Sequence, residues 1–108
     1  MYFVETGDGG VRVADLSEWS AMFEDTDGRR VARDTDGVRD VSTVFLGLEH
    51  GRDPNGQPYL YETMVFRAGS TDDLDCERYI TRGHALAGHA AMCAKWLNRP
   101  DLPPPEEG

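Results

Sequence analysis

The chain has 108 residues, of which 20 are Asp or Glu and 11 are Lys or Arg, so its formal net charge is −9. This length fits one domain, and the excess of acid argues against general binding to nucleic acid or to an anionic membrane surface. We find no apolar run of membrane-spanning length and no secretory leader, and Cys76 and Cys93 show no metal-ligand spacing. We therefore expect one reduced, cytoplasmic domain over residues 1–99 and a flexible Pro- and Glu-rich tail over residues 100–108.

The N-terminal part predicts a small hairpin followed by a short helix. Short apolar runs at residues 2–5 and 11–13 flank a glycine-rich turn, which is typical of two short strands. Asp15 or Ser17 can then cap a helix over about residues 16–25. Four apolar side chains would share one face of this helix, namely Leu16, Trp19, Met22 and Phe23.

The middle of the chain predicts a sheet, and the C-terminal part predicts a longer helix. Strand-like segments occupy residues 29–34, 38–50, 59–67 and 76–81. Because the links between them are short, they favour an antiparallel meander over parallel crossovers. Thr81 caps a helix over about residues 82–97, with a predicted apolar stripe of Leu86, Ala90, Cys93 and Leu97 flanked by His89 and Trp96. We expect an α+β fold, in which a mainly antiparallel four-stranded sheet carries the longer helix on one face.

Both faces of the two central strands are partly apolar. Period-2 alternation places Val44, Leu46, Leu48 and His50 on one face of the first strand, and Leu60, Glu62, Met64 and Phe66 on one face of the second. The opposite faces carry Phe45, Tyr59, Tyr61 and Val65. Either helices cover both sides of the sheet, or one side is a partner surface. We predict that Phe45, Tyr59 and Tyr61 form a binding surface for another protein.

Glu62 is unusual because it lies among apolar residues in the middle of a strand. If the hairpin aligns the apolar faces, Glu62 lies near Leu48 and diagonally from His50. A pair of Glu62 and His50, joined by His89, could serve as acid and base or as metal ligands. Alternatively, Glu62 pairs with an arginine or lies on an open face, and His89 is a hydrogen-bonded histidine at the edge of the core. The sequence does not favour an enzyme, and we predict no metal or other cofactor.

The start of the C-terminal helix carries positive side chains where acidic ones are usual. Arg82 and His84 lie beside the positive end of the helix dipole, together with free backbone amides. Such a turn could bind a phosphate or a carboxylate. The alternative is a solvated arginine that slightly destabilises the helix.

Several strings resemble those of a family of small uncharacterised proteins encoded by actinobacterial phages and prophages. They are LSEWSAMFED (16–25), RRVARD (29–34), VSTVFLGLEH (41–50), YETMVF (61–66) and ERYITRGHALAGH (77–89). The resemblance implies a phage or prophage origin and brings no activity with it. The chain departs from the family pattern at residues 82–84, where the family is acidic.

These observations predict a small accessory protein that binds a host or phage protein without catalysis. One version is an inhibitor of a host defence or nucleic-acid enzyme that imitates the charge of DNA, which requires an acidic stripe on the surface. The alternatives are an enzyme that uses His50, Glu62 and His89, and a self-assembling virion-associated protein. The sequence leaves the oligomeric state open.

Overall fold

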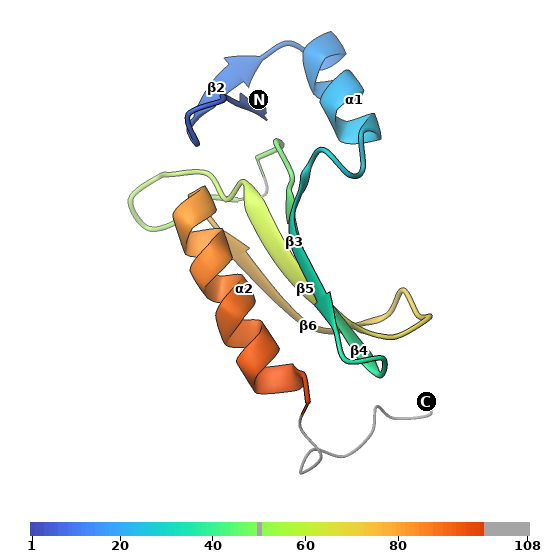
Figure 1. The fold of residues 1–108 in the computed structure, drawn as a ribbon. Coiled ribbons are helices and arrows are strands. Elements are labelled where there is room, and N and C mark those ends of the chain that lie inside the picture. The colour runs from blue at the N-terminus through green and yellow to red at the C-terminus, as the bar shows by residue number, and fades with distance from the viewer. Residues whose placement is uncertain (50, 99–108) are drawn as a thin grey trace.

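The computed structural model describes residues 1–49 and 51–98. Its elements are β1 (Tyr2–Glu5), β2 (Val11–Ala14), α1 (Leu16–Glu24), β3 (Arg30–Thr35), β4 (Arg39–Phe45), β5 (Tyr61–Arg67), β6 (Asp73–Tyr79) and α2 (Arg82–Trp96). β1 and β2 form an antiparallel hairpin, and the other strands form an antiparallel meander in the order β3-β4-β5-β6. α2 packs along one face of the meander, and the hairpin and α1 lie beyond one end of it (Figure 1). The predicted α+β fold is confirmed, whereas the predicted tail over residues 100–108 lies outside the described residues.

No described helix is both long and apolar enough to cross a lipid bilayer.

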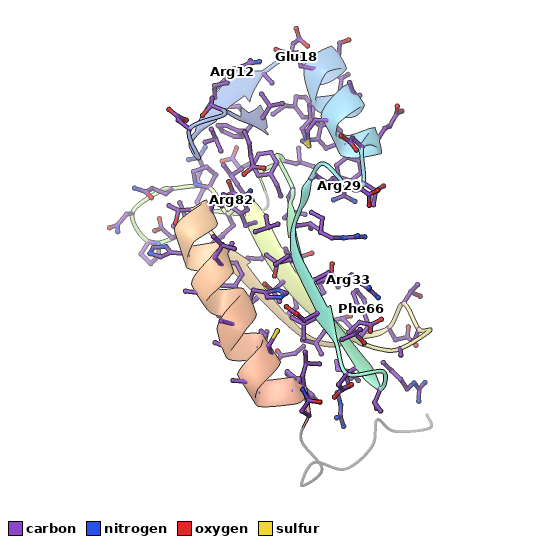
Figure 2. The ribbon with its side chains drawn as sticks, viewed as in Figure 1. Arg12, Glu18, Arg29, Arg33, Phe66 and Arg82 are labelled. Carbon is purple, nitrogen blue, oxygen red and sulfur yellow. The ribbon has the colours of Figure 1, made fainter. Side chains whose placement is uncertain are left out.

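α1 begins at a side-chain cap and contacts the end of the meander through Trp19 and Met22. Asp15 is the N-cap, and its carboxylate accepts a hydrogen bond from the backbone N–H of Glu18 at 2.8 Å. The Glu18 carboxylate pairs with Arg12 of β2 (Figure 2). The indole Nε1 of Trp19 donates to the carbonyl of Leu46 at 3.1 Å. No side chain of α1 is fully buried, and Leu16 is exposed, so the predicted apolar face is only partly used.

β4 ends at Phe45, five residues before the predicted end of its strand. Gly47 follows with φ at +64°, a left-handed conformation that favours glycine. A Cβ atom at this position would lie 2.5 Å from the carbonyl oxygen of Phe3, so the close approach of β1 also requires glycine. Leu48 then pairs with Tyr2 of the hairpin rather than with β5. The expected alignment of Glu62 with Leu48 is therefore wrong.

Each edge strand of the meander contains one residue more than its neighbour. In β3 the register shifts between Arg30 and Ala32, so Val31 is the extra residue. In β6 the register shifts between Asp73 and Asp75, so Leu74 is the extra residue. Such bulges bend an edge strand and raise its twist. Val31 and Leu74 both pack against the core beneath α2.

The buried face of α2 differs from the predicted stripe. Ala85, His89 and Met92 face the sheet, whereas the side chain of Leu86 is 47% exposed. Bulky side chains of the sheet fill the space beneath the helix, so the helix residues above them must be small. Ala85 accordingly belongs to the same buried cluster as Phe45. A stripe drawn through the largest apolar residues of the helix therefore misplaces its buried face.

The core beneath α2 consists of two apolar clusters with a polar layer between them. One cluster comprises Phe45, Leu60, Tyr61 and Ala85, and the other comprises Val41, Val65, Met92 and Leu97. The buried polar residues Thr43 of β4, Thr63 of β5 and His89 of α2 fall between the clusters in the order of each element. Because buried polar groups are costly unless they are paired, the hydrogen bonds of this layer fix where α2 sits on the sheet.

Candidate functional site

The two faces of the meander have different surroundings. α2 covers the face that carries Phe45 and Tyr61, and no helix among the described residues packs on the other face. Five residues form the centre of this second surface, which we call the open face, namely Ser42, Val44, Met64, Phe66 and Cys76. Figure 2 shows Arg33 and Phe66 on the side of the sheet away from α2. The side chains of Val44, Met64 and Phe66 keep part of their surface in solvent.

Two residues of the predicted binding surface, Phe45 and Tyr61, lie on the face that α2 covers and not on the open face. Phe45 is 0% exposed and Tyr61 is 1% exposed, because both lie beneath α2. Tyr59 is half-buried and lies before β5 begins. Within β4 and β5, alternation separates the two faces correctly, but it does not show which face a helix will cover. Before β5 begins it fails, because Leu60, predicted to lie with Met64, belongs to the buried cluster of Phe45 and Tyr61.

Three exposed arginines lie on the rim of the open face. Arg33 pairs with Asp40 at 3.4 Å, and Arg78 pairs with Glu62 at 2.9 Å. In each pair the arginine is the outer member, since the side chains of Arg33 and Arg78 are both 46% exposed, against 21% for Asp40 and 12% for Glu62. Arg30 adds a third exposed guanidinium on β3. The rim also carries carboxylates, since Asp73 is exposed beside Phe66 and Asp27, the partner of Arg30, is 93% exposed. Solvent therefore meets charges of both signs around an apolar centre.

Glu62 is held by its strand neighbours on the open face. Its Oε2 accepts the hydrogen bond from Arg78 Nε, and the Sγ atom of Cys76 lies 3.5 Å from the same oxygen. Loss of water around the sulfur, together with the Glu62 carboxylate, raises the pKa of the Cys76 thiol to about 11. Pairing with an arginine on an open face was the alternative interpretation of Glu62, and it is the one that the structure shows.

His89 lies on the opposite side of the sheet, within a chain of hydrogen bonds that runs from Thr63 to Asp34. Thr63 Oγ1 and Thr43 Oγ1 are 2.5 Å apart, and Thr43 Oγ1 is 2.7 Å from His89 Nδ1. On the other side of the imidazole ring, Nε2 is 2.7 Å from Asp34 Oδ2. The Sγ atom of Cys93 lies 3.8 Å from the same carboxylate oxygen. Partial burial, followed by the Asp34 carboxylate, raises the pKa of the Cys93 thiol.

The sheet separates Glu62 from His89, so the predicted convergence of these two residues is wrong. Glu62 pairs across the open face, whereas His89 is buried beneath the other face. The third member of that group, His50, lies outside the described residues. No shared substrate could contact both Glu62 and His89.

Arg82 is engaged within the protein. Its Nη1 atom donates to Glu5 Oε2 at 2.9 Å, and the Tyr61 hydroxyl donates to the same oxygen at 2.8 Å. Burial, together with this carboxylate, raises the pKa of Tyr61. The backbone N–H of His84 donates to the Thr81 hydroxyl at 3.1 Å, which confirms Thr81 as the N-cap. The anion beside Arg82 is thus the chain's own Glu5, and an external anion there is not supported.

The grouping of Asp34, His89 and Cys93 was not predicted from the sequence. The described residues contain this one group of at least three His, Cys, Asp or Glu side chains whose ligand atoms all lie within 4.8 Å of one another. One signal was available, because His89 and Cys93 are four residues apart and share a helix face. Nothing local to β3 indicates that Asp34 joins them, since its position depends on how α2 packs on the sheet.

A surface pocket of about 580 Å³ adjoins this group and is lined by residues of β3, of α2 and of the two positions after α2. Its lining includes Asp34, His89 and Cys93, together with Thr35 and Asn98. The three side chains are therefore reachable from solvent, although His89 itself is only 6% exposed.

Comparisons with protein-family models, with curated proteins and with solved structures find no match to this chain.

Proposed function

We propose that this chain is a non-catalytic protein-binding module, an accessory protein of phage or prophage type that acts in the host cytoplasm. Its partner, a host or phage protein, docks on the open face of the meander. The observation that carries this proposal is the part-exposed apolar centre of Val44, Met64 and Phe66, which no described helix covers. Apolar patches rimmed by polar groups mark interaction surfaces more often than other parts of a protein surface.

Charge indicates what kind of protein surface would fit. The chain as a whole carries a net charge of −9, yet three exposed guanidinium groups, those of Arg30, Arg33 and Arg78, lie around the open face, together with the exposed carboxylates of Asp27 and Asp73. Asp40 pairs with Arg33, and Glu62 pairs with Arg78. In both pairs the carboxylate is less exposed to solvent than the guanidinium group. A partner with an apolar centre and carboxylates at its rim would complement this arrangement, because such charges steer association and fix register.

The acidic residues support this choice over imitation of nucleic acid. Exposed acids lie on α1 and in the turn after it, at Glu24 and Asp27, and also in the β5–β6 turn, at Asp72. Figure 1 shows these two places at different ends of the meander. A docking surface formed by these acids would have to bridge the whole sheet, whereas the open face is continuous.

The experiment compares capture of host or phage proteins by the tagged chain and by two variants. In Met64→Thr/Phe66→Thr, the open face loses its largest apolar side chains while it keeps residues that suit a strand. Leu86→Ser is the matched control, because it removes an exposed apolar side chain from the outer side of α2. We expect a captured partner whose dissociation constant rises at least about tenfold in the first variant and stays unchanged in the control.

Two results would count against the proposal. One is a set of captured proteins that bind the Met64→Thr/Phe66→Thr variant as tightly as they bind the unchanged chain. The other is loss of binding in the Leu86→Ser control, which would place the interface on α2. Light scattering coupled to size exclusion tests the remaining alternative, since a defined oligomer that the double substitution dissociates would identify a second copy as the occupant.

A further inference from the structure

We propose that Asp34, His89 and Cys93 form a binding site for one divalent cation of the zinc type. The site is independent of the proposed docking surface, because it lies between β3 and α2 on the other side of the sheet. Each residue offers one ligand atom, and the three atoms all lie within 4.8 Å of one another.

The donor atoms select the kind of cation. Imidazole nitrogen, thiolate sulfur and carboxylate oxygen are all ligands that Zn²⁺ accepts, whereas Mg²⁺ and Ca²⁺ require oxygen ligands almost exclusively. A thiolate and a carboxylate together balance the two positive charges of the ion. Three protein ligands leave a fourth position, which would face the solvent-accessible pocket beside the site.

The spacing of the ligand atoms is close to what a tetrahedral ion requires. Zinc bonds of about 2.0–2.3 Å place neighbouring ligand atoms roughly 3.5 Å apart. The Asp34 Oδ2 atom lies 2.7 Å from His89 Nε2 and 3.8 Å from Cys93 Sγ. The Asp34 side chain is 60% exposed and can adjust, while His89 is fixed in the core. Entry of an ion therefore requires a small movement of one exposed carboxylate.

The buried side of His89 already has the partner that a metal-bound histidine needs. Histidine ligands usually donate their second ring N–H to a neighbouring acceptor, which fixes the ring and the tautomer. Here Nδ1 is 2.7 Å from the Thr43 hydroxyl, which is itself 2.5 Å from the Thr63 hydroxyl. Hydroxyl groups can either donate or accept. In one tautomer of His89, Nε2 carries the ring proton and donates it to Asp34. In the other tautomer, Nδ1 donates its proton to the Thr43 hydroxyl, and the lone pair of Nε2 is available to a cation.

α2 and β3 hold the site together without a loop. His89 and Cys93 lie one turn apart on α2, and Asp34 pairs with Val41 in the sheet, which directs it to the side that α2 covers. Sites built on helices and strands keep their geometry better than sites on loops. Binding would therefore clamp the edge strand β3 to α2.

The test titrates the full chain with Co²⁺ and Zn²⁺. Cobalt reports its ligands directly, because a thiolate ligand gives a charge-transfer band in the near ultraviolet and a tetrahedral site gives strong visible bands. We expect one ion per chain with both features. Cys93→Ser should remove the charge-transfer band and weaken binding at least about 100-fold, and Asp34→Asn should weaken it roughly tenfold.

Cys76→Ser is the matched control, because Cys76 is the other free cysteine and lies on the open face. This control should bind one cobalt ion with an unchanged spectrum and affinity. Zn²⁺ should also raise the melting temperature of the unchanged chain and of the control, but not that of Cys93→Ser. Circular dichroism establishes that both cysteine variants are folded before titration.

Either of two results would overturn the proposal. The first is no saturable binding of cobalt or zinc by the unchanged chain. The second is binding that Cys93→Ser leaves intact, which would place the ion at other residues. Neither result would bear on the open face, so failure of the cation site and failure of the proposed docking function can be distinguished.

Discussion

Two glycines in α2 should respond in opposite directions to replacement by alanine. Gly83 and Gly88 both have ordinary helical backbone angles, so alanine fits the backbone at either position. A Cβ atom at Gly83 would meet only the Thr81 hydroxyl oxygen, at 4.0 Å. A Cβ atom at Gly88 would lie 2.2 Å from the ring of Tyr79, which packs against the helix at that position.

The expected magnitudes follow from two opposing effects. Alanine is favoured over glycine inside a helix by about 1 kcal/mol, and by less in the first turn, so Gly83→Ala should raise the free energy of unfolding by roughly 0.5 kcal/mol. At Gly88 the same gain is set against displacement of the Tyr79 ring, and overpacking of a core costs about 1–3 kcal/mol. Gly88→Ala should therefore lower the free energy of unfolding by about 1 kcal/mol. For a domain of this size, that corresponds to a melting temperature lower by roughly 4–8 °C.

Urea denaturation, followed by circular dichroism, measures both variants against the unchanged chain. A third variant isolates the cause, because Tyr79→Val removes the ring that the new methyl group would strike. On that background Gly88→Ala should become stabilising by up to about 1 kcal/mol. If Gly88→Ala stabilises the unchanged chain as Gly83→Ala does, the packing of Tyr79 on α2 is not as described.

Two further predictions concern carboxylates that accept more than one hydrogen bond. Asp36 accepts three backbone N–H groups at 2.8 Å, which lower its pKa to about 2, so Asp36→Ala should cost about 2 kcal/mol at pH 7. Since this pKa lies below that of an unfolded aspartate, the contribution of Asp36 to the free energy of unfolding is complete above about pH 4 and disappears as the pH falls toward 2. If Asp36→Ala lowered the free energy of unfolding equally at pH 7 and pH 2, this prediction would be wrong. Glu5→Ala should cost about 2 kcal/mol, because it leaves the buried Tyr61 hydroxyl without its acceptor. Glu5→Gln keeps an acceptor for Tyr61 and loses only the charge of the part-buried pair with Arg82, so it should cost less than about 1 kcal/mol. Equal costs for the two Glu5 variants in urea denaturation would show that the tyrosine bond contributes nothing.

Features that depend on neighbouring residues could be predicted from the sequence. Thr81 was expected as a cap, and Asp15 was one of two candidates with Ser17. Both Asp15 and Thr81 accept a backbone N–H three residues further along the chain. The antiparallel order was expected from short links, and two links of the meander, residues 36–38 and 68–72, are short. At the caps and at these two turns, the interaction that decides the structure lies within a few residues. The link between β4 and β5 is longer and runs over residues 46–60.

Features that depend on packing between distant elements could not be predicted in the same way. Phe45 and Phe66 are both apolar strand residues, yet one is buried beneath α2 and the other lies on the open face. The difference arises because α2 turns Ala85 and Gly88 toward the sheet, where small residues leave room for its aromatic side chains. The cation-binding group has the same origin, since only this rotation of α2 brings Cys93 to Asp34.

The two extra residues in the edge strands also limit how the sheet can grow. A strand from another molecule could add to β3 or β6 only by matching their free backbone groups over several residues, and each bulge interrupts that match. Charged side chains along both strands, among them Arg33 and Glu77, oppose such pairing further. The open face can therefore stay uncovered while the edge strands still disfavour edge-to-edge pairing of sheets into fibrils.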